Sequence, residues 1–172
     1  VWVVNNGTTA LQLALHAANV SGEVLTTPFS FVATTGAVLW ERCTPVFVDI
    51  EPRFLTIDPA KLAAAITPPT TAILATHVYG FPCPVDALAE FAREHGLKLI
   101  YDAAHTFGCE LNGRPLVTYG DISCLSFHAT KVFRTIEGGA VMVKGCEVLA
   151  EPVKLRRWFR QLGNNHLCER LC

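Results

Sequence analysis

The sequence has few charges, with 17% charged residues among 172, and its 14 basic and 15 acidic side chains leave a formal net charge of -1. These charges are dispersed, so no basic footprint for nucleic acid or anionic lipid stands out. Long apolar runs are also missing, because polar residues interrupt segments 31–40 and 72–79 before the roughly 18 residues that a membrane helix needs. We therefore expect neither a nucleic-acid nor a membrane partner.

Signals for paired cysteines are absent as well. The seven cysteines form no CxxC pair and lie mostly in apolar segments, which is typical of thiols in a reducing compartment and predicts a cytoplasmic protein. His166, Cys168 and Cys172 match no standard zinc spacing, so no metal site is expected. The chain begins Val-Trp-Val-Val without a charged leader, which predicts that there is no signal peptide and that the sequence starts inside a longer protein.

Core-forming residues dominate, because 51% of the chain is hydrophobic and short β-rich runs alternate with segments of helical period. Strands are predicted at residues 2–4, 23–26, 45–48, 72–76, 97–101, 123–127 and 140–143. Helices are predicted at residues 8–19, 31–40, 59–66, 85–95 and 147–160. This alternation predicts an α/β fold with three α/β/α layers, in which helices cover both faces of a mainly parallel seven-stranded sheet.

Ligands of such sheets bind where strands end at the carboxyl edge. Asn6, Gly7 and Thr8 follow a strand and open a helix, where a glycine permits close approach and free amides favour a phosphate. A simple helix cap by Asn6 or Thr8 explains this segment too. Phe31 follows the second strand and is suited to stack on a planar ring, although an aromatic there is usually part of the core.

Two charged residues also follow strands. Asp102 ends an apolar strand, and a buried carboxylate requires a cation or strong donor; capping of a following helix is the alternative. Lys131 lies five residues after Ser126, and an amine held near apolar surface suits Schiff-base chemistry; a snorkelling surface lysine is the alternative. Together, a phosphate cradle, a stacking aromatic, an acid for a ring nitrogen and a lysine for an aldehyde predict a site for pyridoxal 5'-phosphate.

Several segments resemble the sugar-nucleotide aminotransferases of the DegT/StrS group, which are fold type I enzymes. The most specific are Asp102-Ala103-Ala104-His105 and Ser126-Phe127-His128-Ala129-Thr130-Lys131; segments 6–11, 44–50, 57–59, 65–68 and 77–80 are similar too. The resemblance implies that residues 1–160 form an incomplete pyridoxal-phosphate-binding large domain. It also implies that residues 161–172 are a tail off the family pattern, and that the C-terminal small domain is absent from this sequence.

The resemblance implies catalytic roles for three residues. Lys131 would bind the cofactor covalently and later transfer a proton, and Asp102 would keep the pyridine nitrogen protonated. His105 occupies the position beside the ring oxygen, where the family has Gln or His. His128 falls among residues that line the substrate pocket.

Cofactor-binding positions follow from the same resemblance. Ser126 and the amides of Thr8 and Thr9 would hold the phosphate, while Phe31 and the small Ala104 would lie against the two ring faces.

The His-containing variants of both motifs, with Tyr101 before the acid and Glu137-Gly138-Gly139 after the lysine, are most similar to enzymes that aminate a dTDP-linked keto-6-deoxyhexose with glutamate as donor. The implied protein is a homodimer that acts in amino-sugar biosynthesis. Two alternatives remain. A sugar dehydratase of the same fold has His in place of the lysine, and Lys131 argues against it. A regulatory or ligand-binding module, or an inactive fragment, would keep the fold without the chemistry.

Overall fold

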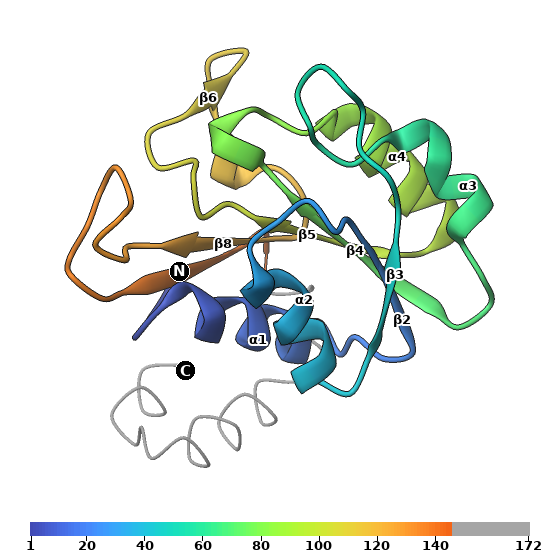
Figure 1. The fold of residues 1–172 in the computed structure, drawn as a ribbon, viewed down its shortest axis with the longest axis horizontal. Coiled ribbons are helices and arrows are strands. Elements are labelled where there is room, and N and C mark those ends of the chain that lie inside the picture. The colour runs from blue at the N-terminus through green and yellow to red at the C-terminus, as the bar shows by residue number, and fades with distance from the viewer. Residues whose placement is uncertain (146–172) are drawn as a thin grey trace.

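The computed structural model describes residues 1–145, and its centre is one twisted sheet (Figure 1). The strands are β1 (Trp2–Val4), β2 (Glu23–Thr26), β3 (Thr44–Phe47), β4 (Thr70–Thr76), β5 (Lys98–Asp102), β8 (Ile122–Ser126) and β9 (Gly139–Val143). Their order is β1-β9-β8-β5-β4-β2-β3, and β9 runs antiparallel to both neighbours while the other neighbouring pairs are parallel. The predicted mainly parallel seven-stranded sheet is confirmed.

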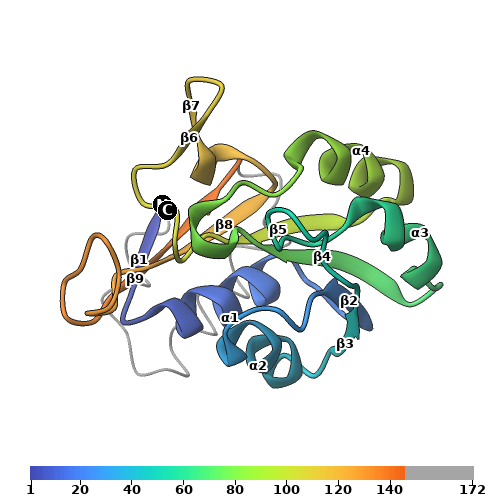
Figure 2. The same ribbon diagram turned by 45° about the horizontal axis from the view of Figure 1, so that its top comes forward.

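Helices cover both faces of the sheet (Figure 2). On one side lie α1 (Gly7–Ala17) and α2 (Val32–Trp40), and on the other lie α3 (Leu62–Ala65) and α4 (Val85–His95). Successive strand residues supply the two cores alternately: in β5, Ile100 packs into the core under α1, whereas Leu99 and Tyr101 pack into the core under α4. Since both faces are buried, the central strands are apolar throughout, which is why the sequence pattern predicts them well.

The structure differs from the sequence prediction in local detail. The helix predicted at residues 59–66 is divided into a 3-10 turn, η1 (Pro59–Lys61), and the short α3, with the Asp58 carboxylate accepting the Ala60 amide at 3.0 Å. An unpredicted hairpin pairs β6 (Glu110–Leu111) with β7 (Arg114–Pro115). Its turn, Asn112-Gly113, has positive φ angles of 54° and 74°, the conformation that Asn-Gly favours in a two-residue hairpin loop.

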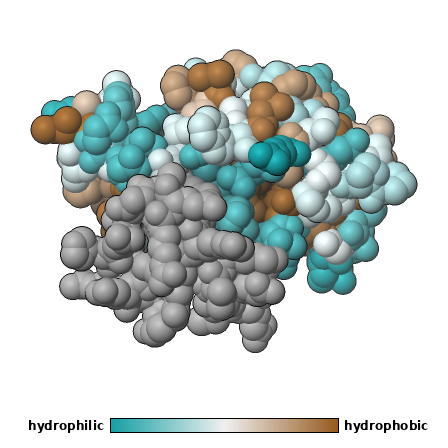
Figure 3. All heavy atoms as spheres, turned by 90° about the horizontal axis from the view of Figure 1, so that it is seen from below, coloured by the Kyte–Doolittle hydropathy of each residue, from teal (hydrophilic) through white to brown (hydrophobic). Residues whose placement is uncertain are grey.

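Further 3-10 turns follow β4 and β7, namely η2 (Val78–Gly80) and η3 (Leu116–Thr118). None of the helices within residues 1–145 combines the length and apolar character that membrane crossing requires. Apolar side chains are exposed on α2 and β3, among them Leu39, Trp40 and Phe47. Seen from below in Figure 3, the coloured surface mixes polar and apolar residues.

Some predictions lie outside the described residues. They are the helix at 147–160, the boundary at residue 160, the tail at 161–172 and the thiols of Cys146, Cys168 and Cys172. Within the described residues, the free thiols are those of Cys43, Cys83, Cys109 and Cys124.

Candidate active site

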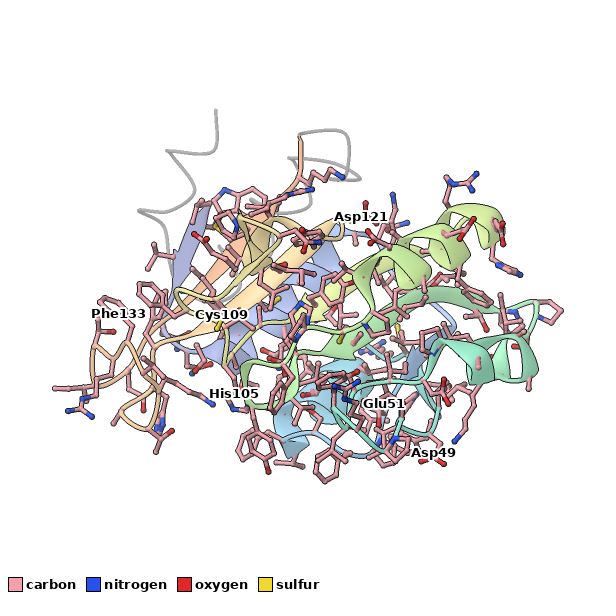
Figure 4. All side chains as sticks on the ribbon, turned by 90° about the horizontal axis from the view of Figure 1, so that it is seen from above. Asp49, Glu51, His105, Cys109, Asp121 and Phe133 are labelled. Atoms are coloured by element: carbon pink, nitrogen blue, oxygen red, sulfur yellow. The ribbon has the colours of Figure 1, made fainter. Side chains whose placement is uncertain are left out.

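A pocket of about 660 Å³ opens at the carboxyl edge of the parallel strands. Parallel pairing of β5 with β8 sets Asp102 opposite Cys124, so the segments that follow these two strands emerge side by side. In Figure 4, His105 and Asp121 lie at opposite ends of the parallel strands. His105 follows the carboxyl end of β5, whereas Asp121 precedes the amino end of β8. Every sequence-predicted site residue except Thr9 lines the pocket: Thr8, Phe31, Asp102, Ala104, His105, Ser126, His128 and Lys131.

The first turn of α1 forms one wall. Asn6 has extended backbone at φ -163° and caps the helix, with its Oδ1 accepting the Thr9 amide at 2.8 Å. The Thr9 amide thus already has an acceptor, whereas Thr8 is exposed to the pocket. Gly7 touches Ser126 closely, since a Cβ on Gly7 would lie 2.7 Å from the Ser126 Cβ and 3.0 Å from its Oγ. The helix N-terminus and the Ser126 hydroxyl therefore meet in a tight cradle suited to an anion.

Asp102 lies at the bottom of the pocket and is only 5% exposed. Its Oδ2 accepts the Thr34 hydroxyl at 2.7 Å, and its Oδ1 accepts the Ala104 amide at 3.1 Å. The residues after Asp102 form turns, so the alternative that this carboxylate caps a following helix does not apply. Because two donors leave further lone pairs open, the carboxylate can accept a third donor from the pocket.

His105 has a defined tautomer. Its Nδ1 accepts the backbone N–H of Tyr79 at 3.1 Å, so in the neutral ring the proton resides on Nε2. Partial burial and the nearby charge of Lys131 lower the pKa of His105, while Asp102 opposes the shift. Tyr79 reaches this position with a left-handed backbone, φ 53° and ψ 20°. The neutral ring thus offers an N–H donor from its other nitrogen.

Lys131 lies on the loop between β8 and β9. The loop closes through the Phe127 amide, which donates to the Gly138 carbonyl at 2.8 Å, and through the Thr135 amide, which donates to the Phe127 carbonyl at 3.0 Å. Stacking of Phe133, labelled in Figure 4, on Phe107 at 4.4 Å between ring centroids ties this loop to the segment after β5. Aromatic packing therefore links the loop that carries Lys131 to the segment that carries His105.

Lys131 is half-buried, and within residues 1–145 it belongs to none of the ion pairs. The neighbouring His128 is exposed and lies 3.6 Å from Glu137, measured from Nε2 to Oε1. The His128 Nδ1 also lies 3.0 Å from the Thr130 hydroxyl. These contacts hold His128 at an exposed position in the pocket lining. Because the Lys131 amine belongs to no ion pair among the described residues, it is available for covalent chemistry.

Sequence reasoning missed several residues at the site. Ser30 and Tyr79 line the pocket; Ser30 lies next to the predicted Phe31, and Tyr79 lies within residues 77–80, which resemble the family. Thr34 contacts Asp102 across a sequence separation of 68 residues, and no spacing rule connects the two. Within residues 1–145, no group of three or more His, Cys, Asp or Glu side chains is arranged to hold a metal ion.

The architecture defines a class. A mainly parallel sheet between two helical layers, with its pocket at the carboxyl strand ends, agrees with a truncated large domain of a pyridoxal-phosphate-dependent transferase of fold type I. Residues 1–165 match the DegT/DnrJ/EryC1/StrS aminotransferase family, and the chain belongs to that family. The family depends on pyridoxal phosphate.

The chain spans less than half the length of the relatives that it matches. It is 49% identical over 154 residues to a dTDP-4-amino-4,6-dideoxy-D-glucose transaminase of Shigella dysenteriae, and the match covers 90% of the chain but 42% of that protein. The structure of DesI in the presence of its TDP-sugar product is similar with a TM-score of 0.85 and 42% identity, covering 92% of this chain and 40% of DesI. NtdA of Bacillus subtilis with bound cofactor PMP gives a TM-score of 0.83 at 33% identity, covering 91% and 35%.

Proposed function

We propose that the protein is a pyridoxal-phosphate-dependent aminotransferase that moves an amino group from glutamate to a dTDP-linked keto-6-deoxyhexose. The observation that carries this proposal is that Asp102, the last residue of β5, and Lys131, on the segment after the neighbouring parallel strand β8, line one pocket. Their charges both act on His105 between them, which agrees with a common site. The similarity to a dTDP-amino-sugar transaminase supports the choice of substrate class.

The residues present fit the cofactor. The cradle of Thr8, Gly7 and Ser126 at the start of α1 suits a phosphate. Asp102 accepts hydrogen bonds from two neutral donors and, within residues 1–145, belongs to no ion pair. A protonated pyridine nitrogen would supply the positively charged donor that this carboxylate lacks. Phe31 is 73% exposed at the pocket, where its ring offers a flat apolar face.

In the mechanism, each side chain has a distinct task. The bound cofactor supplies an electron sink for the electron pair released when the substrate loses a proton. Lys131 would hold the cofactor aldehyde through Nζ and, once displaced, carry the proton between two carbon atoms. Asp102 would keep the ring nitrogen protonated, because a buried carboxylate favours a charged partner. His105 would donate its Nε2 proton to the ring oxygen, and Ala104 would leave room for close approach to the ring.

The whole protein is proposed to act as a cytoplasmic homodimer in amino-sugar biosynthesis, with His128 near the nucleotide-sugar subsite. Two half-reactions follow from this assignment. In the first, glutamate would leave as 2-oxoglutarate, and in the second the ketosugar would accept the amino group at its carbonyl carbon; Lys131 and Asp102 would hold the cofactor that carries the amino group between them. Because amine and carbonyl are exchanged in each half, the overall reaction needs no external oxidant or reductant.

The test uses the full-length gene product loaded with pyridoxal phosphate and reduced with borohydride, followed by peptide mass spectrometry. We expect one covalent adduct at Lys131, and 2-oxoglutarate formation when glutamate and a dTDP-4-keto-6-deoxyhexose are added. Lys131→Ala should abolish both signals. Lys98→Ala is the matched control, because Lys98 is also half-buried but begins β5 at the opposite edge.

Other outcomes overturn the proposal. A colourless protein that forms no adduct would favour the binding-module alternative, and an adduct at another lysine would reject the role of Lys131. Cofactor binding with loss of water from the sugar, and no 2-oxoglutarate, would favour the dehydratase.

A further inference from the structure

Three hydroxyl groups form a chain that ends on the Asp102 carboxylate. Thr34 Oγ1 lies 2.7 Å from Asp102 Oδ2, and Ser30 Oγ lies 2.7 Å from Thr34 Oγ1. Thr76 Oγ1 lies 3.0 Å from Ser30 Oγ. The chain therefore joins the last residue of β4, the segment before α2, and the last residue of β5.

Counting the hydroxyl protons shows which group donates in each hydrogen bond of this series. An ionised carboxylate only accepts hydrogen bonds, so the single proton of Thr34 Oγ1 points at Asp102. The Thr34 oxygen can then only accept from Ser30, whose own proton is thereby used. Thr76 must in turn donate to Ser30. All three O–H groups therefore donate in the direction of the carboxylate, and each hydrogen bond polarises the next.

The chain and the backbone together anchor both carboxylate oxygens. Thr34 holds Oδ2, and the Ala104 amide holds Oδ1 at 3.1 Å. The terminal torsion of an Asp side chain is otherwise broad and roughly two-fold, so one anchor alone would leave the carboxylate plane free to turn. Thr34 is fully buried and does not line the pocket, so it can act on a ligand only through its two hydrogen-bond partners that do, Asp102 and Ser30.

We propose that Thr34 is a positioning residue that orients the Asp102 carboxylate toward the pyridine nitrogen, with Thr76 and Ser30 directing the Thr34 proton; this inference rests on the proposed function. Thr34 supplies a charge-assisted hydrogen bond that fixes the acceptor geometry before the ring arrives. The role depends on the hydroxyl and not on the volume of the side chain. Valine, which has nearly the shape of threonine, therefore removes the effect, and serine restores it.

The experiment compares Thr34→Val, Thr34→Ser and Thr26→Val in the full-length gene product. Thr26 is the matched control because it is also fully buried, ends β2, and its hydroxyl has no hydrogen-bond partner within residues 1–145. Three quantities are measured for each variant: the dissociation constant of pyridoxal phosphate, the visible absorption band of the bound cofactor, and the thermal unfolding midpoint. The band depends on the protonation state of the bound cofactor, to which the ring nitrogen contributes, and a purely structural role would not change it.

We expect Thr34→Val to weaken cofactor binding about tenfold, the equivalent of about 1.4 kcal/mol, and to shift the absorption band. Thr34→Ser should remain within roughly threefold of wild type with an unshifted band, and Thr26→Val should bind like wild type. Should Thr34→Val fail to fold, Thr76→Val provides the second variant. This substitution removes the donor to Ser30, and we expect cofactor binding to weaken by roughly threefold, which is about half the effect of Thr34→Val on a logarithmic scale.

The contrary results are distinct. Cofactor affinity and band unchanged in Thr34→Val would overturn the positioning role, even if its unfolding midpoint falls. Failure of Thr34→Ser to restore the band would overturn it too, because the hydroxyl would then not be the active feature. In the fallback comparison, Thr76→Val with wild-type affinity and band overturns it. A wild-type protein that forms no adduct at Lys131 would overturn the proposed function and this inference together.

Discussion

Replacement of Gly7 by alanine tests how tightly α1 is packed against the end of β8. A Cβ at residue 7 would lie 2.7 Å from the Ser126 Cβ and 3.0 Å from its Oγ, both closer than ordinary contacts. The neighbouring backbone has little room to yield, because a Cβ on Gly139, which pairs with Ser126, would lie 2.5 Å from the Asn6 carbonyl oxygen. Overpacking of this kind costs about 1–3 kcal/mol, and we expect Gly7→Ala to lower the free energy of unfolding by that amount.

The same chemical change at Gly36 provides the control. Gly36 lies inside α2, and a Cβ there would meet nothing within 4 Å. Alanine is favoured over glycine inside a helix by about 0.5–1 kcal/mol, so Gly36→Ala should stabilise the protein. The two glycine-to-alanine variants are thus expected to differ by about 2 kcal/mol or more, with opposite signs.

Urea unfolding of the full-length gene product, followed by circular dichroism, measures both values under one set of conditions. A Gly7→Ala variant as stable as Gly36→Ala would refute the argument, since Ser126 and α1 would then separate at no cost. A second readout concerns the cradle. If Gly7 and Ser126 hold a phosphate, Gly7→Ala should also weaken binding of pyridoxal phosphate, whereas Gly36→Ala should leave it unchanged.

Two further predictions concern histidine protonation. Burial lowers the pKa of His77 from 6.5 to about 3, so the unfolded chain binds the extra proton and the free energy of unfolding decreases as the pH falls from 6.5 toward 3. In His77→Phe, which retains a ring against Tyr101, this dependence should be weaker by up to about 1.4 kcal/mol per pH unit in urea unfolding at several pH values; an unchanged slope would contradict it. For His105, whose pKa is lowered first by burial and then by Lys131, an NMR titration of the cofactor-free protein should give a midpoint below 6.5 that rises in Lys131→Ala. A midpoint insensitive to that substitution would show that the two side chains do not interact.

The sequence predicts the main sheet well because its strands are buried on both faces. Residues of β4 alternate between the two cores, with Leu74 under α1 and Ile73 under α4, so continuous apolar runs mark the strands. The β6–β7 hairpin has strands of two residues each, too short for any periodicity. The Asn112-Gly113 turn is a local signal for this hairpin, but two-residue strands beside it add no pattern that would support a prediction.

Prediction of the site succeeds for residues that follow strands and fails for residues that act through others. Asp102 ends β5 and Lys131 lies on the segment after the neighbouring strand β8, so the parallel pairing of these strands brings both to the carboxyl ends of the sheet. Thr34 lies in the first turn of α2, and its contact with Asp102 depends on how that helix packs against the sheet. The packing of a helix against a sheet is a tertiary property, and the spacing of residues in one sequence does not predict it.

His105 and Asp102, the side chains proposed to contact the cofactor ring, are each oriented by a hydrogen bond from another residue, but the two donors are of different kinds. His105 is held by the backbone N–H of Tyr79, whose left-handed conformation costs about 1–3 kcal/mol and must be stabilised by the surrounding packing. Asp102 is held by the hydroxyl of Thr34. A backbone donor tolerates any side chain that accepts the same φ and ψ, whereas a hydroxyl donor requires Thr or Ser. Since orientation decides whether Asp102 and His105 can serve a ring, retaining the reacting side chains is a necessary but not a sufficient condition for the chemistry.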